Sequence, residues 1–260
     1  MGMMPATHSE APSSETAGTH RLDSILPQPE DTRLGKSIQV QRMFDRLAPR
    51  YDLLNDWISM GMHRIWKRLA CQKLQLQPGD RVLDVCTGTG DLTGLLQKLV
   101  GETGFVEGLD FSEDMLIQAR QRFQGFSNIH FTQGDALSLP YPDHAFDGAI
   151  ISFGLRNVTD IPRALAEMHR VLKPGSRMVN LDTCPTPEWP ILNLYISQII
   201  PRLGRLLAGD EAAYRYLSES TRHFLTPAEL KIAFETAGCT EVESQMLILG
   251  LASLQVGRKQ

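Results

Sequence analysis

The stretch RVLDVCTGTGDLT, residues 81–93, decides the fold. Its first half is a short apolar run of the kind that forms a strand buried on both faces, as in a parallel sheet. Gly88 and Gly90 follow at once, and without side chains they let a nucleotide-like ligand approach the backbone. A strand, a glycine loop and a helical pattern in this order predict the first unit of an open α/β sheet, with a ligand bound at the loop.

Strand-like runs recur along the chain, with helical patterns between them. The runs are FVEGLD at 105–110, IHFTQGD at 129–135, FDGAIISF at 146–153 and RMVNLD at 177–182. Two closing strands near 240–247 and 250–256 must form an antiparallel hairpin, because a parallel return needs about a dozen residues. The alternation predicts a doubly wound α/β fold whose seven-stranded sheet is mostly parallel.

Two helices in this pattern carry recognisable start signals. Ser112 fits an N-cap, because Glu113 and Asp114 follow it in the first turn, where the helix dipole favours acids. Thr226 fits a second N-cap, with Pro227 at the first helical position. We therefore expect helices to begin at these two points.

The segments outside the sheet have their own patterns. Residues 1–36 are rich in Pro, Ser, Thr and Glu, so we expect a disordered arm before a single domain at 37–260. Residues 37–77 show a helical pattern and predict a helical prelude. Residues 184–224 break the alternation and predict a helical insertion. Its apolar stretch at 191–200 fits either a core helix or a lid over a ligand.

The composition excludes several classes of function. Lys and Arg number 26 against 30 Asp and Glu, so the chain has no overall positive field to attract nucleic acid. The four cysteines are far apart and show no zinc spacing, which predicts buried packing residues and no metal site. The chain shows no signal peptide and no membrane span, so we expect a cytoplasmic protein.

Polar residues follow the ends of the predicted strands. Asp110 ends the second strand, about 20 residues past the loop, where a carboxylate accepts hydrogen bonds from ribose hydroxyls. Asp135 follows the third strand, where it can face an adenine amino group, and Ser152 ends the fourth. Any one of these acids alone is equally well an ordinary loop cap. Ligands of open α/β sheets bind at the carboxyl ends of strands, so the candidate cofactor residues are Asp84, Gly88, Gly90, Asp110, Asp135 and Ser152.

The glycine loop itself separates two kinds of cofactor. A dinucleotide fingerprint has a third glycine three residues after Gly90, but Thr93 stands there and Gly94 comes one residue late. The loop therefore favours S-adenosylmethionine (SAM) over NAD. The chain also lacks the Tyr-x-x-x-Lys pair of an NAD-dependent reductase, which is the first rival interpretation.

Five strings in this order resemble the UbiE/MenG family of quinone-biosynthesis C-methyltransferases. They are VQRMFDRLAPRYDLLND at 40–56, SMGMHRIWKR at 59–68, VLDVCTGTGDLT at 82–93, ISFGLRNVTD at 151–160 and HRVLKPG at 169–175. The likeness runs from about residue 40 to the end. It implies a class I SAM-dependent methyltransferase (Rossmann-like) fold in which Thr89, Asp110, Asp135, Ala136 and Ser152 contact SAM. Thr87 departs from the pattern, since many relatives have glycine there.

The resemblance also implies the reaction, which is the C-methylation of a prenylated quinol. Such a site must stabilise phenolate-like charge and align the ring carbon with the methyl group. Arg156, just past the fourth strand, is our first candidate for the oxyanion, and Asn157 could fix the water that removes the proton; a surface arginine is the alternative. Tyr51 from the helical prelude is the third catalytic candidate. Asn55 and His63 are further candidates, although His63 fits a packed helix histidine better.

The sequence also bears on which quinol ring is methylated and on two rival functions. LDFS at 109–112 and KPGSR at 173–177 resemble the naphthoquinone enzymes of the family more than its dual-function members. This resemblance implies a naphthoquinol, demethylphylloquinol or demethylmenaquinol, rather than a benzoquinol of ubiquinone biosynthesis. Net acidity, and a fourth strand that does not end in Asn-Pro-Pro-Tyr, argue against a nucleic-acid methyltransferase. A SAM-binding module without activity is the remaining rival. Peripheral contact with a membrane, where such a substrate resides, and oligomer formation are left open.

Overall fold

The computed structural model describes residues 61–185, 219–247 and 250–260, together with Val40, Asp45, Asp56, Ser59 and Tyr216. The predicted arm at 1–36, most of the helical prelude and the apolar stretch at 191–200 lie outside the described residues. Within the described ranges, no helix has the length and apolar character needed to cross a membrane.

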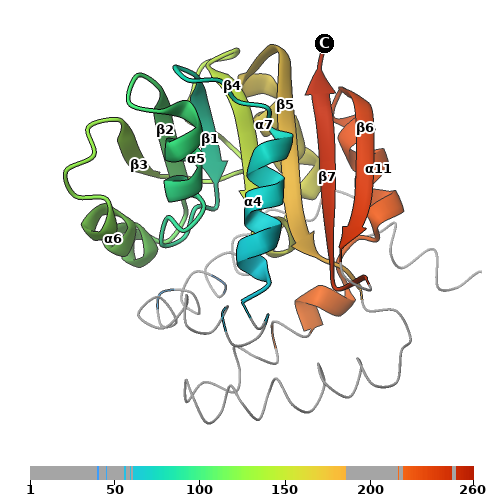
Figure 1. Cartoon of the computed structure of the whole chain (residues 1–260). Helices are drawn as coiled ribbons and strands as arrows, with labels where there is room; N and C mark the ends of the chain where they lie inside the picture. The colour runs from blue at the N-terminus through green and yellow to red at the C-terminus, as the bar shows by residue number, and fades with distance from the viewer. Residues whose placement is uncertain are drawn as a thin grey trace, which may run out of the picture.

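In the part of the chain that the structure describes, one sheet has seven strands in the order β3-β2-β1-β4-β5-β7-β6 (Figure 1). The strands are β1 Arg81–Val85, β2 Phe105–Asp110, β3 Ile129–Gln133, β4 Phe146–Ser152, β5 Leu172–Thr183, β6 Cys239–Leu247 and β7 Ala252–Lys259. Strands β1 to β5 pair in parallel, and β7 runs antiparallel to both β5 and β6. The mostly parallel sheet with an antiparallel hairpin at its end is confirmed.

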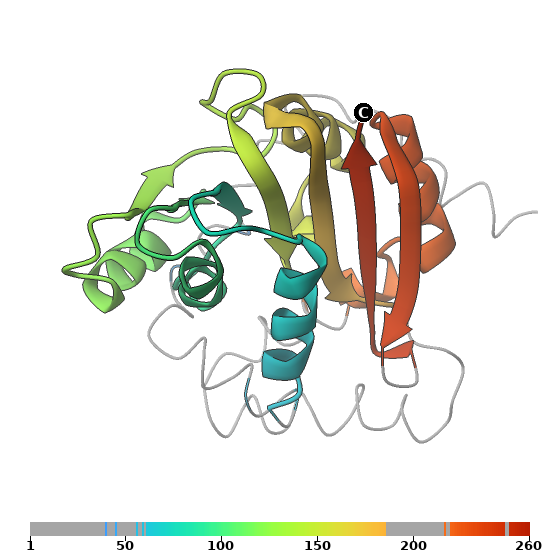
Figure 2. The same cartoon turned by 45° about the horizontal axis from the view of Figure 1, so that its top comes forward.

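Helices cover both faces of this sheet (Figures 1 and 2). On one face lie α4 His63–Lys73 and α5 Thr93–Val100; on the other lie α7 Ile161–Val171 and α11 Pro227–Thr236. The central strands are buried on both sides, and alternate residues of one strand enter opposite cores. Val82 and Ile150 pack with α4 and α5, whereas Leu83 and Ile151 pack with α7.

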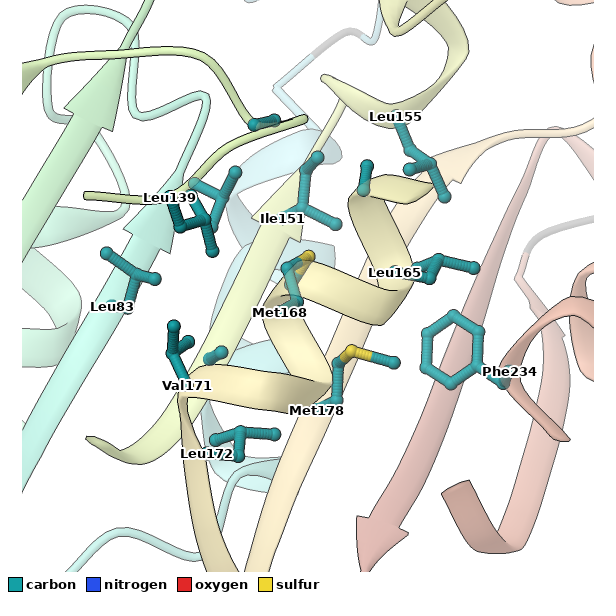
Figure 3. Packing of buried hydrophobic residues seen from close by; sticks show 14 of the residues in the cluster. Leu83, Leu139, Ile151, Leu155, Leu165, Met168, Val171, Leu172, Met178 and Phe234 are labelled. Atoms are coloured by element: carbon teal, nitrogen blue, oxygen red, sulfur yellow. The ribbon is translucent and has the colours of Figure 1, made fainter. Parts of the chain in front are cut away.

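The core on the α7 face is the larger of the two. Figure 3 shows Met168 and Leu165 of α7 between Ile151 of β4 and Phe234 of α11. All four of these side chains are fully buried. The helix α7 presents an apolar stripe because its alanine, leucine, methionine and valine recur at three and four residues. Packing of this kind makes the strand ends rigid, and the strand ends carry the candidate site.

The predicted helix starts are confirmed. The helix α6 Glu113–Arg122 begins after Ser112, whose hydroxyl accepts the Met115 N–H at 3.2 Å. Thr226 caps α11 and forms a capping box, because the Glu229 carboxylate accepts the Thr226 N–H at 2.7 Å. These local bonds satisfy backbone donors that a helix start leaves without a partner inside the helix.

Three strands have boundaries that differ from the prediction by two residues or more. The strand β5 begins at Leu172 rather than residue 177, because Lys173-Pro174-Gly175 sits in an irregular stretch where the pairing with β4 shifts register. A Pro-Gly pair usually ends a strand. Here a bulge in β5 accommodates the pair, and Gly175 adopts a φ of +84°. The last strand lies at 252–259 rather than 250–256, and β3 ends at Gln133, two residues before Asp135.

The strand order fixes where a ligand binds. Chain connections leave β1 toward β2 on one side and β4 toward β5 on the other, so the order reverses between β1 and β4. The crevice outside the carboxyl ends of strands at such a switch point is the usual ligand site of open α/β sheets. Figure 1 shows that α4 begins at this same edge, where β1, β4 and β5 end.

Candidate active site

The loop after β1 is held by hydroxyls bonded to a buried carboxylate. Thr87 and Thr93 each donate a hydroxyl hydrogen bond to Asp84 Oδ2, at 2.7 and 2.8 Å. Asp84 is 1% exposed, and burial raises its pKa to about 6. Thr87, the departure from the family pattern, thus fixes the loop to the strand that precedes it. Asp84 lies beneath this loop.

The backbone of the loop turns through left-handed conformations. Gly88 and Gly90 have φ of +58° and +78°, values that glycine adopts at little cost. The Gly88 N–H donates to Asp110 Oδ2 at 2.8 Å, so the loop and the end of β2 are bonded together. Gly90 faces away from the crevice, where a Cβ would come within 2.8 Å of the Phe123 ring. Gly88 therefore joins the loop to the end of β2, whereas Gly90 allows the loop to pack against Phe123.

Asp110 lies at the centre of the candidate cofactor site. Its second oxygen accepts the Ser112 N–H at 2.9 Å, and burial raises the pKa of this carboxyl. The Gly88 and Ser112 N–H groups thus bond different oxygens of this carboxylate, which has about four lone-pair sites in all. The remaining lone pairs suit the two hydroxyls of a ribose.

A cleft of about 830 Å³, partly open to solvent, runs along these strand ends. Of the predicted residues, its walls include Gly88, Asp110, Asp135, Ala136, Ser152 and Asn157. Asp135 is exposed at the rim, where its carboxylate accepts the Leu137 N–H at 2.9 Å. Thr89 and Asp84 instead line a smaller cavity next to the cleft. The structure thus brings most of the predicted cofactor residues to one crevice.

The hydroxyl of Ser152 fits this crevice to a polar ligand. Its Oγ is buried and has no hydrogen-bond partner among the residues that the structure describes. Buried polar atoms without a partner are rare in proteins and are usually explained by a water or a ligand. Ser152 lines both the cleft and the smaller cavity. The Ser152 hydroxyl, the Asp110 carboxylate and the loop backbone together offer hydrogen-bond donors and acceptors that suit the adenosine of SAM.

Arg156 lies on the short 3₁₀ helix η2 Leu155–Asn157 that follows β4. Its Nη1 donates to Asp182 Oδ1 at 2.6 Å, and the two side chains are 6% and 0% exposed. The alternative of a surface arginine is therefore wrong. The guanidinium does not line the main cleft; its Cζ lies 5.9 Å from the centroid of Phe153, which does.

Asn157 is placed directly in the wall of the cleft. Its Oδ1 accepts the hydroxyl of Tyr216 at 3.2 Å, and its Nδ2 donates to the Phe153 carbonyl at 3.4 Å. Burial raises the pKa of Tyr216, with the nearby Arg156 opposing and Asp182 adding to that rise. The other predicted catalytic residue, Tyr51, and Asn55 lie outside the described residues.

His63 forms part of a charged cluster at the start of α4. The Ser59 hydroxyl and His63 Nδ1 are 2.7 Å apart, and His63 Nε2 lies 3.6 Å from Asp56 and 3.9 Å from Asp91. Burial and the Lys67 ammonium lower the pKa of His63. The packed helix histidine of the sequence interpretation agrees with its 5% exposure.

Several residues at the site carry no signal that the sequence analysis used. Asp182 is the last residue but one of β5, and Asp110 is the last residue of β2, so the strand-end rule identifies Asp182 once it is applied to every strand. Phe153 has φ of +55°, a left-handed conformation that side chains rarely adopt and that often marks a functional position. Lys67 and Asp91 form an ion pair of 2.7 Å beside the loop. The sequence does not indicate this pair, because a lysine in an amphipathic helix is ordinarily exposed to solvent.

Sheet order, glycine loop and strand-end acids together define a class I SAM-dependent methyltransferase. Solved structures of this fold match the chain. A SAM-dependent methyltransferase from Aquifex aeolicus has a TM-score of 0.54 and 22% identity over 72% of this chain and 85% of its own. The [4+2]-cyclase SpnF has a TM-score of 0.63 and 19% identity over 86% and 96%. At such identities the likeness concerns the fold alone.

The chain belongs to the ubiE/COQ5 methyltransferase family, which matches residues 32–259. Demethylmenaquinone methyltransferases from strains of Staphylococcus aureus are 40% identical over 226 residues, which is 85% of this chain and 93% of theirs. The protein is therefore an enzyme that transfers a methyl group, with SAM as the donor. The resemblance stated from the sequence is confirmed.

Proposed function

We propose that this enzyme methylates a ring carbon of a prenylated naphthoquinol, demethylmenaquinol or demethylphylloquinol, at a late step of menaquinone or phylloquinone biosynthesis. The similarity to demethylmenaquinone methyltransferases over 93% of their length carries the proposal. The strings LDFS and KPGSR support the same ring. A benzoquinol of ubiquinone biosynthesis is the alternative.

The reaction joins a nucleophilic ring carbon to a methyl group. When bound, SAM supplies that methyl on a sulfonium, with the thioether of S-adenosylhomocysteine as the leaving group. The ionised quinol oxygen pushes electron density onto the neighbouring carbon, the new C–C bond forms as the C–S bond breaks, and the ring proton then passes to water. The chain must stabilise the oxyanion and hold the ring carbon in line with the methyl.

Two of the residues proposed for these tasks, Arg156 and Asn157, lie on η2. Asp182 anchors Arg156, and the positive charge of its guanidinium favours an oxyanion nearby. Asn157 faces the cleft and is oriented by Tyr216, so its amide can fix the water that accepts the ring proton. Tyr51 completes the proposed catalytic set. Among cofactor residues we propose Asp84, Gly88, Thr89, Gly90, Asp110, Asp135, Ala136 and Ser152, with Asp84 and Gly90 acting by shaping the loop.

We also propose that residues 184–224 act as a lid over the prenyl tail. Two contacts from its described residues support this role. Tyr216 bonds Asn157 in the cleft wall, and the Thr221 hydroxyl lies 3.1 Å from that of Thr183 at the end of β5. Residues 191–200 are apolar enough to touch a bilayer surface. Sedimentation with phospholipid vesicles tests this: mutation of the stretch to polar residues reduces partitioning, and unchanged partitioning contradicts the membrane contact.

A competition between acceptors tests the ring. Purified enzyme is given labelled SAM with equal concentrations of reduced demethylmenaquinone, reduced demethylphylloquinone and a demethylated polyprenyl benzoquinol. We expect label in the two naphthoquinols and a kcat/KM for the benzoquinol at least about tenfold lower, because ring shape discriminates by one to a few kcal/mol. Preferential labelling of the benzoquinol contradicts the proposal.

A further inference from the structure

Phe153 lies where two ligand spaces meet at the carboxyl edge of the sheet. It follows β4 directly, and its side chain is half-buried. It lines the cleft of about 830 Å³ and also a smaller cavity of about 350 Å³ next to it. Among the described residues, those that line both spaces are Cys86, Gly88, Ser152 and Phe153. Of this set, Phe153 has the one large apolar side chain.

The backbone of Phe153 is held in place from three sides. Its φ of +55° is unfavourable for a bulky side chain, and such strain is concentrated at functional sites. Its N–H donates to the Leu181 carbonyl of β5 at 2.7 Å, and its own carbonyl accepts Asn157 Nδ2 at 3.4 Å. The next residue, Gly154, packs closely on the loop after β1, since a Cβ there would lie 2.5 Å from that of Cys86. The position of the ring is therefore fixed by the fold.

The ring of Phe153 lies between two buried cations. Its centroid is 5.9 Å from Arg156 Cζ and 5.9 Å from Lys67 Nζ. Arg156 is the residue proposed to stabilise the oxyanion of the acceptor. An acceptor whose oxygen reaches this guanidinium therefore has its ring next to Phe153.

The acceptor must also meet the methyl donor, because transfer requires the ring carbon and the methyl group to be in contact. The groups suited to the donor, Asp110 and Ser152, line the main cleft. In the part of the chain that the structure describes, Phe153 is the aromatic residue that both lines this cleft and lies beside Arg156. Its ring face is thus available to an aromatic acceptor that lies between the donor and the guanidinium.

From this geometry we infer that the Phe153 ring packs against the ring of the acceptor and favours a two-ring naphthoquinol over a one-ring benzoquinol. Aromatic pairs are stabilised beyond the burial of their area, and a fused second ring offers more surface for the contact. The Arg156 guanidinium holds the oxygen and Phe153 holds the ring face, so the two together orient the ring carbon. The inference rests on the proposed methylation of a quinol and adds a residue that selects the ring.

The variant Phe153→Leu tests the contact, because leucine keeps the apolar bulk but has no flat face. Steady-state kinetics of the full chain give kcat and KM for reduced demethylmenaquinone and for a demethylated benzoquinol with the same tail. We expect KM for the naphthoquinol to rise about 3- to 10-fold, the range of an aromatic pair, and KM for the benzoquinol to rise less. The contact exists before and during transfer, so kcat should change less than KM. Equal rises for the two acceptors, or no rise, overturn the inference.

Calorimetric titration with S-adenosylhomocysteine separates contact with the acceptor from contact with the donor. Phe153→Leu should bind S-adenosylhomocysteine as wild type does, and a loss as large as the rise in KM overturns the inference. Phe131→Leu is the matched control, because Phe131 packs in the same core as Phe153 but lines neither space. We expect the control to keep the wild-type KM for both acceptors. A control that raises KM as Phe153→Leu does contradicts a specific contact.

If Phe153→Leu does not fold, Phe153→Gly serves in its place, because glycine adopts a left-handed φ at little cost. The glycine variant lacks the ring and should raise KM for the naphthoquinol at least as much, whereas a wild-type KM overturns the inference. Failure of the proposed function is seen in wild type itself, as preferential methylation of the benzoquinol. Failure of the inference is seen instead as a ratio of kcat/KM for the two acceptors that is the same in wild type and variant.

Discussion

Arg156 and Asp182 form a buried ion pair between the loop after β4 and the end of β5. The Nη1–Oδ1 distance is 2.6 Å, and Asp182 is fully buried. Asp182 also accepts the backbone N–H groups of Arg156 and Thr183, at 3.2 and 2.8 Å. This network joins η2 to the sheet, so the position of Asn157 in the cleft depends on it.

Removal of one partner of this pair should destabilise the fold. Asp182→Ala leaves the Arg156 charge buried without its carboxylate, and we expect a loss of about 3–5 kcal/mol in the free energy of unfolding, measured in urea. The double variant Arg156→Met, Asp182→Leu should recover only part of that stability, because it removes the unpaired buried charge but leaves the backbone N–H groups of Arg156 and Thr183 without their acceptor. The double variant should still lack methyl transfer. Transfer at the wild-type rate by this variant contradicts a role for Arg156 in the reaction.

Tyr216 should affect the reaction without affecting the cofactor. Tyr216→Phe removes the hydroxyl that donates to Asn157 Oδ1, so the amide is less well oriented, and we expect kcat to fall about 3- to 10-fold, the range of one neutral hydrogen bond. Binding of S-adenosylhomocysteine should not change. Tyr141→Phe is the control, since that hydroxyl bonds the Glu107 carboxylate of β2 and neither residue lines the cleft. Equal effects of the two substitutions argue against the assignment.

Substitution of Ser152 should weaken cofactor binding without lowering the stability of the fold. Its hydroxyl has no partner among the described residues, so Ser152→Ala should leave the free energy of unfolding unchanged or slightly higher. Loss of the bond to a ligand should weaken binding of S-adenosylhomocysteine about 3- to 10-fold. Thr226→Ala reverses the pattern: it removes the cap of α11, costs about 1 kcal/mol and leaves binding unchanged. A Ser152→Ala protein with wild-type affinity would show that this hydroxyl does not contact the cofactor.

Asp84 should make stability depend on pH. Burial raises its pKa in the folded protein from 3.8 to about 6, so the folded state binds the proton more tightly than the unfolded state does. The contribution of Asp84 to stability is therefore greatest below pH 3.8 and falls as the pH rises to about 6. The loss amounts to about 3 kcal/mol for a shift of roughly two units.

Asp84→Asn removes this titration and keeps an acceptor for the threonine hydroxyls. The difference in unfolding free energy, variant minus wild type, should therefore increase between pH 4 and pH 7 in urea titrations. Other acids titrate in both proteins and cancel in the difference. A difference that does not vary with pH contradicts the burial of a raised-pKa carboxyl under the loop.

Most of the fold was predictable because its elements are specified locally. Apolar runs such as 81–85 indicate buried strands, and Ser112 and Thr226 signal helix starts through bonds to residues three positions away. The strand β5 was predicted too short, since Pro174-Gly175 usually ends a strand and only the pairing with β4 reveals the bulge. Local signals thus give the type of each element, and tertiary pairing gives its ends.

The site was predictable only in part because ion pairs join distant residues. Asp110 follows from its place at a strand end, which is a local feature. The Arg156–Asp182 pair spans 26 residues and the Lys67–Asp91 pair spans 24, and neither spacing has a sequence signature. Arg156 was identified from its place just past the fourth strand, but its burial against Asp182 was not predicted. Only the folded arrangement brings such partners together.

Transfer of a ¹³C-methyl group from labelled SAM to reduced demethylmenaquinone, followed by NMR of the product, tests the central claim most directly. If the cleft between β1 and β4 aligns the quinol carbon with the methyl, the label appears as a methyl on the naphthoquinol ring carbon, and Asp110→Ala abolishes it. An O-methyl resonance, or no incorporation by wild-type enzyme that binds S-adenosylhomocysteine, would contradict the account.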